Sequence, residues 1–326
     1  MITRRFLFGA AVAMGMAGSM VQPAMAADPA LTGEGMTVYF QMGGNPGDSA
    51  TLARELGAKA AADLLKVKLM PQYAGWDQQK MLEQANQALA AQPDAIVVMG
   101  HSGTDSMKRF LDEAKEAGIV VVTNNTRLPG TGLSYFGLDN YAAGKLLGEQ
   151  MIAAGLKSGD KAVIYGTFEQ TAHADISRGT IEAFDAAGVT YDKLQWSNEA
   201  VQDPSLAVPV IASYLQSNPD VKAIAVPGHS GITAVLAKVM EAAGKEPGSL
   251  ITGGYDISPL TIDGLRKGYV TVVVDQQPYL QGYMPVLAAV LQKRYGIAGL
   301  EMNTGGGVFT KDNFEWVVPL VEQGVR

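Results

Sequence analysis

Cysteine is absent from the 326-residue chain, and only three histidines are present. Without cysteine the protein has no disulfides, no thiolate nucleophiles and no cysteine-ligated zinc or iron–sulfur sites. Three histidines are too few for a His-rich metal site. The net charge is −7, and no cluster of Lys or Arg occurs outside the extreme N-terminus. This pattern argues against nucleic acid as a partner, so we expect no metal, no cofactor and no nucleic acid.

Long apolar runs are also lacking, except near the N-terminus. Arg4 and Arg5 precede an apolar run over residues 6–21, and the triplet Ala24-Met25-Ala26 follows it. This order predicts a signal peptide over residues 1–26 that is cleaved after Ala26. The alternative is a membrane anchor, but the run is shorter than the roughly 20 residues that a spanning helix needs. The paired arginines fit twin-arginine export and general secretory export equally well.

After the predicted signal peptide, strand-like runs alternate with amphipathic helical patterns. The first series has expected strands at 36–40, 67–70, 95–99 and 119–123, with helices at 49–65, 77–90 and 104–117. The second series has expected strands at 162–165, 193–196, 223–226 and 250–252, with helices at 175–187, 207–216 and 231–243. Such alternation is typical of βαβ units with parallel strands. The length is sufficient for two hydrophobic cores, so the sequence predicts two α/β units in tandem.

Polar and small residues follow the expected strands. They occupy positions 43–48, 100–102, 124–126, 228–230 and 253–256. In open parallel sheets, the carboxyl ends of the strands line the ligand crevice. Asp48, His101 and His229 are therefore candidate ligand contacts. The same residue types also form turns and cap helices, and for each of the three this alternative stays open.

Three segments near the C-terminus carry a resemblance to a known family. Residues 255–256, 265–268 and 272–283 resemble the aromatic-Asp loop and the Gln-bearing hinge strand of periplasmic sugar receptors of the ribose-binding type. Further likenesses lie at Asn45-Pro46, 93–98, 119–125, 138–140 and Arg178. The chain thus resembles a type I substrate-binding protein of an ABC importer.

The resemblance implies an α/β fold with two Rossmann-like lobes, whose parallel sheets are joined by a three-stranded hinge. The N-terminal lobe would comprise residues 36–138 plus about 277–306, and the C-terminal lobe residues 139–276 plus about 307–326. A ligand would lie between the lobes. The family's binding roles would fall on Asn45, Asn125, Arg178, Asp256 and Gln276.

Two departures from the family pattern bear on the ligand. Ribose receptors follow their Asn-Pro with two Phe that clamp the sugar ring, but here Gly47 and Asp48 stand at those positions. The family's Asp-Arg pair in the fourth loop is replaced by Asn125-Thr126. Both differences argue against ribose itself. The aromatic side chains that could stack on a ligand instead are Trp76, Phe168 and Tyr255.

The candidate side chains offer hydrogen-bond acceptors, amide donors and a guanidinium fork, which match the paired hydroxyls of a sugar. We therefore expect a periplasmic solute-binding component of an ABC importer. Its ligand would be a monosaccharide or sugar alcohol, and its partner would be a membrane permease. We expect a monomer without enzymatic activity. Residues 100–103 and 228–231 only loosely resemble a nucleophile elbow, because they lack G-x-S-x-G. An exported small-molecule hydrolase and a chemosensory sugar receptor are the alternatives.

Overall fold

The computed structural model describes residues 31–169 and 174–326. The predicted signal peptide, residues 1–26, lies outside the described residues. All described residues after Leu31 belong to one compact unit, Thr32–Arg326. Within the described residues, no helix is both long and apolar enough to cross a membrane.

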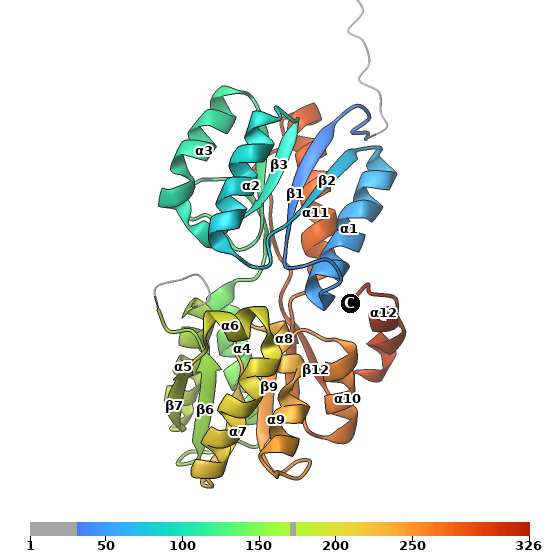
Figure 1. Ribbon diagram of the computed structural model, residues 1–326. Coiled ribbons are helices and arrows are strands. Elements are labelled where there is room, and N and C mark those ends of the chain that lie inside the picture. The colour runs from blue at the N-terminus through green and yellow to red at the C-terminus, as the bar shows by residue number, and fades with distance from the viewer. Residues whose placement is uncertain (1–30, 170–173) are drawn as a thin grey trace, which may run out of the picture. The chain divides into compact units, whose positions relative to one another are not determined.

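Two six-stranded sheets form the framework of this unit (Figure 1). The first sheet has the order β11-β5-β4-β3-β1-β2, and its paired strands are all parallel. Its strands are β1 Thr37–Gly43, β2 Lys68–Tyr73, β3 Ala95–Met99, β4 Val120–Asn125, β5 Ser134–Gly137 and β11 Glu301–Asn303. Residues of β3 and most of β4 are buried, as expected for strands covered on both faces.

The second sheet has the order β12-β10-β9-β8-β6-β7. Its pairs are parallel except that of β10 with β12, which is antiparallel. Its strands are β6 Lys161–Gly166, β7 Thr190–Gln195, β8 Val221–Ala225, β9 Ile251–Tyr255, β10 Val272–Asp275 and β12 Gly307–Thr310. The prediction of two α/β lobes with parallel-dominated sheets is thus confirmed.

Helices cover both sheets. Those packed with the first sheet are α1 Ser49–Leu65, α2 Gln78–Ala90, α3 Thr104–Glu116 and α11 Pro278–Tyr295. Those of the second lobe are α4 Asn140–Ala153, α5 Ala174–Ala187, α6 Asn198–Gln202, α7 Ala207–Ser217, α8 Ser230–Ala234, α9 Leu236–Ala242, α10 Pro259–Lys267 and α12 Val318–Glu322. Short 3₁₀ turns are η1 Gly100–Ser102, η2 Pro204–Leu206 and η3 Glu315–Val317.

One expected helix is split in two in the structure. The single helix predicted over 231–243 is divided into α8 and α9 at Val235, whose φ and ψ of −96° and 4° depart from helical values. The Thr233 hydroxyl donates to the His229 carbonyl and accepts from the Tyr255 amide. These bonds tie the short α8 to the end of β9, so tertiary contacts override the amphipathic pattern.

The chain passes between the sheets three times, after β5, after β10 and after β11. This matches the three-stranded hinge implied by the resemblance. The exact residues at which each lobe begins and ends stay a prediction.

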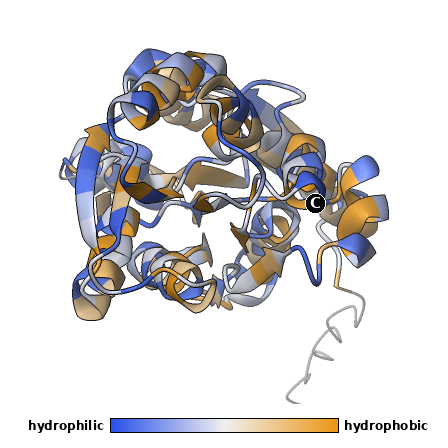
Figure 2. Ribbon diagram, turned by 90° about the horizontal axis from the view of Figure 1, so that it is seen from below, coloured by the Kyte–Doolittle hydropathy of each residue, from blue (hydrophilic) through white to orange (hydrophobic). Residues whose placement is uncertain are grey.

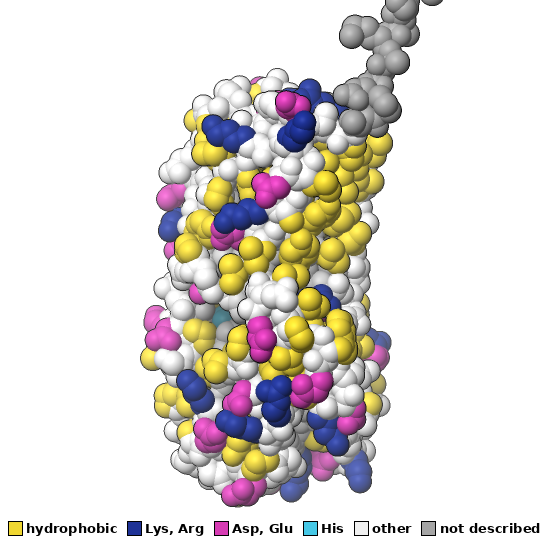
Figure 3. Space-filling model, turned by 90° about the vertical axis from the view of Figure 1, so that its right-hand side faces the viewer, with side chains coloured by type: hydrophobic (Ala, Val, Ile, Leu, Met, Phe, Trp, Pro, Cys, Tyr) yellow, Lys and Arg dark blue, Asp and Glu magenta, His cyan; other side chains and the backbone are white. Residues whose placement is uncertain are grey.

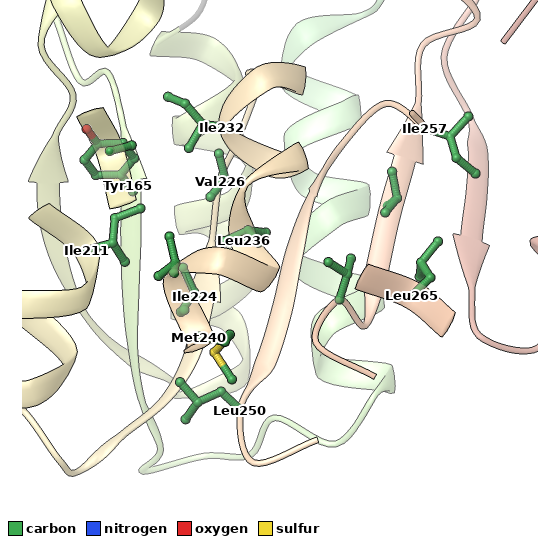
Figure 4. Packing of buried hydrophobic residues seen from close by; sticks show 14 of the residues in the cluster. Tyr165, Ile211, Ile224, Val226, Ile232, Leu236, Met240, Leu250, Ile257 and Leu265 are labelled. Atoms are coloured by element: carbon green, nitrogen blue, oxygen red, sulfur yellow. The ribbon is translucent and has the colours of Figure 1, made fainter. Parts of the chain in front are cut away.

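Hydrophobic clusters fill the space between each sheet and its helices. In the second lobe, Ile224 and Val226 from the sheet pack with side chains such as Leu236 and Met240 (Figure 4). Hydrophobic strands lie among helices with hydrophilic stretches (Figure 2). On one face, hydrophobic side chains gather in the upper part, while charged side chains are frequent in the lower part (Figure 3).

In each lobe, one pair of helices crosses at glycines. A Cβ at Gly282 of α11 would lie 1.9 Å from the Arg54 carbonyl oxygen of α1. Similarly, a Cβ at Gly144 of α4 would lie 1.9 Å from the Ile176 carbonyl oxygen of α5. Both crossings therefore bring backbone against backbone, and the first of them lies beside the candidate site.

Candidate functional site

A cavity of about 570 Å³ lies where the carboxyl ends of strands from both sheets face each other. Trp76 follows β2, Asn125 ends β4, Trp196 follows β7, Tyr255 ends β9 and Gln276 follows β10. The other lining residues are Ala50, Gln78, His101, Thr126, Leu138, Asn140, Thr167, Glu169, Ile176, Gln195, Ser197, Asn198, Val201, Gly228, His229 and Ser230. This placement is that of ligand crevices in open parallel sheets.

The cavity wall is polar and almost uncharged. Glu169 is the one carboxylate among its described lining residues, and none of them is Lys or Arg. Amides, hydroxyls and two imidazoles supply the other polar groups. In the described part of the chain, no group of three or more acidic or His side chains could hold a metal ion. Such a wall suits a neutral ligand with several hydroxyls.

Each lobe contributes one Trp–His pair to the cavity. In the first lobe, the rings of Trp76 and His101 have centroids 6.1 Å apart. In the second lobe, Trp196 and His229 meet edge to face with centroids 5.5 Å apart. Indole rings offer broad apolar faces together with a polar N–H. The two pairs thus provide aromatic surface on both sides of the cavity.

Asn125 and Gln276 are joined at the hinge by a network of side-chain amides. Asn125 Nδ2 donates to Gln276 Oε1 and to Gln281 Oε1, both at 3.1 Å. Asn125 has a left-handed backbone with φ of 59°, a conformation that Asn tolerates better than most residues. The structure therefore brings these two predicted residues together at the cavity wall.

Asp256 lies behind Gln276 and is 3% exposed. Its carboxylate accepts from the Gln276 backbone amide at 3.2 Å and from Gln276 Nε2 at 2.5 Å. Burial, and then the charge of Asp275, raise the pKa of Asp256 to about 7. Asp256 does not line the cavity itself, and in this structure it holds the Gln276 amide in place.

Tyr255 borders the cavity, and its hydroxyl is buried without a hydrogen-bond partner among the described residues. Burial raises the pKa of this phenol, so it stays protonated at any physiological pH. A buried hydroxyl without a partner is uncommon in folded proteins, because it loses its bonds to water. An incoming ligand hydroxyl could supply the missing bond.

Both histidines at strand ends make contacts within the fold. His229 Nδ1 accepts from the Ile232 amide and caps α8, while its Nε2 lies 3.1 Å from the Val201 carbonyl oxygen. His101 Nε2 lies 3.2 Å from the Thr126 hydroxyl. The capping alternative thus describes His229, although its ring still borders the cavity.

Arg178 and Phe168 border a second, adjoining cavity of about 1080 Å³. Arg178 Nη1 is 3.0 Å from the Asp175 carboxylate, and its guanidinium lies 5.1 Å from the Tyr141 ring centroid. The Phe168 ring has Lys193 Nζ 5.5 Å from its centroid. The two cavities share His101, among other residues, so they adjoin in the same cleft.

Asn45 and Asp48 are exposed and line neither of these cavities. Asp48 Oδ2 accepts from the Asn45 backbone amide at 2.7 Å, which closes the turn before α1. The structure thus places both residues in one loop, with Asp48 serving its own turn.

Trp196 was missed as a candidate by sequence reasoning, which placed it as the last residue of the strand 193–196. The strand ends at Gln195, and Trp196 is the first loop residue at the carboxyl end. Gln195 and Asn140 were likewise missed. The signal that could have found Trp196 and Gln195 is their position directly after, or at the end of, a parallel strand, whereas Asn140 begins the helix that follows β5.

Comparison with known proteins agrees with this architecture. A family model described as a periplasmic binding protein domain matches residues 38–295. The chain belongs to the periplasmic binding protein family.

Among the relatives of this family member, a xylose/arabinose-binding protein of Sulfolobus acidocaldarius is 30% identical over 222 residues, which cover 62% of this chain and 53% of the relative. A D-ribose/D-allose-binding protein of Pseudomonas aeruginosa is 27% identical over 208 residues, covering 61% of this chain and 63% of the relative. The matches thus span between about half and two thirds of these curated relatives.

Among solved structures, a glucose-galactose binding protein from Geobacillus stearothermophilus has a TM-score of 0.75 and 27% identity. The match covers 86% of this chain and 99% of the other. The two-lobed fold of this periplasmic binding protein is therefore shared over nearly the whole length of that structure.

Proposed function

We propose that this protein is the solute-binding component of an ABC importer and that it binds a neutral monosaccharide or sugar alcohol between its lobes. The cavity of about 570 Å³ carries this proposal, because its walls come from both lobes and are polar but almost uncharged. The volume lies within the range typical of small-molecule sites. The names of the three relatives refer to pentoses and hexoses, which supports the same ligand class.

The chemistry of the wall supports a ligand with many hydroxyls. Asn125 and Gln276 offer amide groups. The Tyr255 hydroxyl, which has no hydrogen-bond partner among the described residues, offers a donor and an acceptor. A neutral hydrogen bond contributes about 0.5–1.5 kcal/mol net. Several such bonds, together with contact against Trp76 and Trp196, can approach the roughly −8 kcal/mol of micromolar binding. Neither a metal nor a cofactor is needed for this function.

The cavity also supports binding without chemistry. The ring of His229, beside Ser230, is held by the Ile232 amide and the Val201 carbonyl. A hydrolase would need such a ring as a base for a neighbouring hydroxyl. We therefore propose that the protein is not an enzyme.

Asn45, Asp48, Arg178 and Phe168 do not line the main cavity. We propose that any contribution they make to binding comes from outside it.

Binding would be read out by closure of the lobes. A ligand held by residues of both lobes stabilises the closed arrangement, and a membrane permease would recognise that arrangement. The predicted signal peptide and the family support a periplasmic location. We propose a monomer as the working unit.

The test is isothermal titration calorimetry of the purified mature protein against neutral pentoses, hexoses, alditols and cyclitols, with uronic acids and amino acids as charged comparators. A neutral polyhydroxy ligand should bind, and Asn125→Ala or Trp196→Ala should weaken its binding about tenfold or more. Arg178→Ala shows whether the ligand reaches the second cavity. Binding of charged comparators alone, or turnover of ester or glycoside probes, would contradict the proposal.

A further inference from the structure

Arg54 on α1 is a charged side chain that the binding site does not visibly require. It is fully buried, with 0% exposure, and lines neither cavity. Burial lowers its pKa to about 10, so it remains a cation at neutral pH. Within the described residues, no carboxylate lies within ion-pair distance of it, and the buried Asp256 acts on it only as a more distant opposite charge. Because burying a charge without a close counter-ion is costly, the contacts that Arg54 does make call for an explanation.

Two of those contacts, with Gln281 and with Trp76, connect Arg54 to residues at or beside the cavity wall. Arg54 Nη1 donates to the Met42 carbonyl at 2.7 Å, and Nη2 donates to Gln281 Oε1 at 2.9 Å. Its guanidinium also lies 5.7 Å from the centroid of the Trp76 ring, which lines the cavity. The close crossing of α1 and α11 at Gly282 brings Gln281 against Arg54.

The guanidinium determines which way the Gln281 amide points. Arginine has only donors, so Gln281 must turn its oxygen toward Arg54 and its nitrogen away from it. That nitrogen donates to the Thr304 hydroxyl at 3.1 Å and to the Gln276 carbonyl at 3.2 Å. The reversed amide would place its N–H groups against the N–H groups of Arg54, with no acceptor between them.

The orientation of the Gln281 amide in turn constrains the orientation of the two amides at the cavity wall, those of Asn125 and Gln276. The oriented Gln281 oxygen accepts from Asn125 Nδ2 at 3.1 Å, and its nitrogen donates to Gln276 Oε1 at 3.2 Å. Gln276 is left with its nitrogen toward Asp256. The carboxylate of Asp256 holds Gln276 in this same orientation from the other end, because an ionised carboxylate only accepts. The network is therefore polarised by a buried cation at Gln281 and a buried carboxylate at Gln276.

We propose that Arg54 is a positioning residue that fixes the Gln281 amide and so, together with Asp256 at the other end of the network, sets the hydrogen-bond polarity of Asn125 and Gln276 and thereby which hydroxyl arrangement of a neutral sugar the site prefers. The inference rests on the proposed function for its ligand class. Epimeric sugars differ in the direction of one hydroxyl, so a wall of fixed polarity discriminates between them. A wall whose amides can flip accommodates both.

Two epimer pairs test this inference in the full mature protein: D-xylose with L-arabinose, and D-glucose with D-galactose. For each pair we would measure the ratio of dissociation constants. Arg54→Met should reduce the ratio of the best-discriminated pair about tenfold, mainly by weakening the preferred epimer. Arg54→Lys, which keeps a buried donor, should restore part of it. Gln281→Met should act like Arg54→Met, and the double variant should add little to either.

Gln84→Met is the matched control. It removes a hydrogen bond of 2.9 Å from Gln84 Nε2 to the Tyr73 carbonyl in the same lobe, away from both cavities. If Arg54 served only to stabilise the fold, the ratio of dissociation constants would be the same in Arg54→Met as in Gln84→Met. An unchanged ratio in Arg54→Met, Gln281→Met and Arg54→Lys, or equal binding of both epimers by the wild type, would overturn the inference.

A readout without sugar separates this inference from the proposed function. The ¹⁵N side-chain amide signals of Asn125 and Gln276 should shift in Arg54→Met and stay in place in Gln84→Met. If the wild type binds no neutral sugar or polyol of the calorimetric panel, the ligand class is wrong, while the amide signals still report on the polarity. If the signals do not move in Arg54→Met, the positioning role is refuted.

Discussion

The Tyr255 hydroxyl is the clearest single-residue case in which binding and stability separate. It is buried, belongs to a residue of the cavity wall, and has no hydrogen-bond partner in the described part of the chain. Tyr255→Phe should therefore leave the ligand-free melting temperature unchanged or raise it slightly. It should weaken ligand binding by about two- to tenfold, the worth of one neutral hydrogen bond. Differential scanning fluorimetry and calorimetry measure the two effects.

Tyr135→Phe is the contrasting variant. The Tyr135 hydroxyl lies 2.7 Å from the Leu138 carbonyl oxygen and 3.0 Å from that of Asn125. Its removal should lower the free energy of unfolding by about 1 kcal/mol. A loss of stability in Tyr255→Phe as large as that in Tyr135→Phe would show that the Tyr255 hydroxyl has a partner within the fold.

Asp256 gives the fold a pH dependence near neutrality. Burial and the charge of Asp275 raise the pKa of Asp256 to about 7 from the ordinary value of 3.8, against the opposing effects of Gln276 and Arg54. Burial also raises the pKa of Asp275, although Arg326 opposes this. At pH values between 3.8 and about 7, Asp256 therefore holds a proton in the folded state that it releases in the unfolded state. The free energy of unfolding should therefore fall as the pH rises from about 4 through about 7.

The measurement is the melting temperature of the ligand-free protein between pH 5 and 8. It should be lower at pH 8 than at pH 5.5 in the wild type. Asp256→Asn should flatten this slope without abolishing it, because Asp275 still contributes. A variant with the same slope as the wild type would place the responsible group elsewhere.

At the scale of elements, the crossing of α1 and α11 places Gln281 within hydrogen-bond distance of Arg54 on one side and of the amides of Asn125 and Gln276 on the other. Gly282→Ala would place a Cβ 1.9 Å from the Arg54 carbonyl oxygen and force the two helices apart. We expect a loss of about 1–3 kcal/mol in the free energy of unfolding, as for other overpacked sites. Ligand affinity should also fall, because Gln281 moves with its helix. Urea denaturation and calorimetry measure both.

Lys59→Ala on the same helix is the control for that crossing. Its side chain is 54% exposed, and its one ion pair within residues 31–169 and 174–326 is with Glu55, one turn earlier. Such a pair contributes about 0.5 kcal/mol or less. If Gly282→Ala is no more destabilising than Lys59→Ala, the helices can separate without cost and the crossing does not constrain the site.

At the scale of the whole molecule, ligand binding should bring the lobes together. The absence of cysteine allows two labels to be introduced at chosen sites without background. Gln79 on α2 and Gln202 on α6 are exposed, line neither cavity and belong to different lobes. With spin labels at Cys substitutions of these two residues, the distance distribution should shift to shorter values on addition of a bound sugar.

Labels at Gln79 and Lys108, both on helices of the first lobe, provide the control. Their distance should stay unchanged with the same sugar, since each lobe moves as a rigid body. Tight binding without any change in the Gln79–Gln202 distance would contradict closure. A change in both pairs would indicate rearrangement inside the first lobe.

The sequence by itself determined the local features of this protein. The alternation of strand-like and helical patterns predicted two α/β lobes, and polar residues after the strands pointed to the segments 124–126 and 253–256. The resemblance to sugar receptors of the ribose-binding type, carried by short segments, singled out Asn125 and Gln276. These features were accessible because side-chain periodicity and turn chemistry act over a few neighbouring residues. The one-residue error at the end of β7 shows the limit of that reasoning, since it concealed Trp196.

Only the tertiary structure decided which of these residues meet. Arg54 and Gln281 are 227 positions apart in the sequence, and no local pattern predicts that a glycine crossing joins them. Likewise, Asp48 has the chemistry of a ligand contact, and the structure shows that it also closes its own turn. The physical reason is that strand order and helix crossing depend on packing between distant segments. The polarity of the binding site therefore depends on a residue that no strand end or motif singles out.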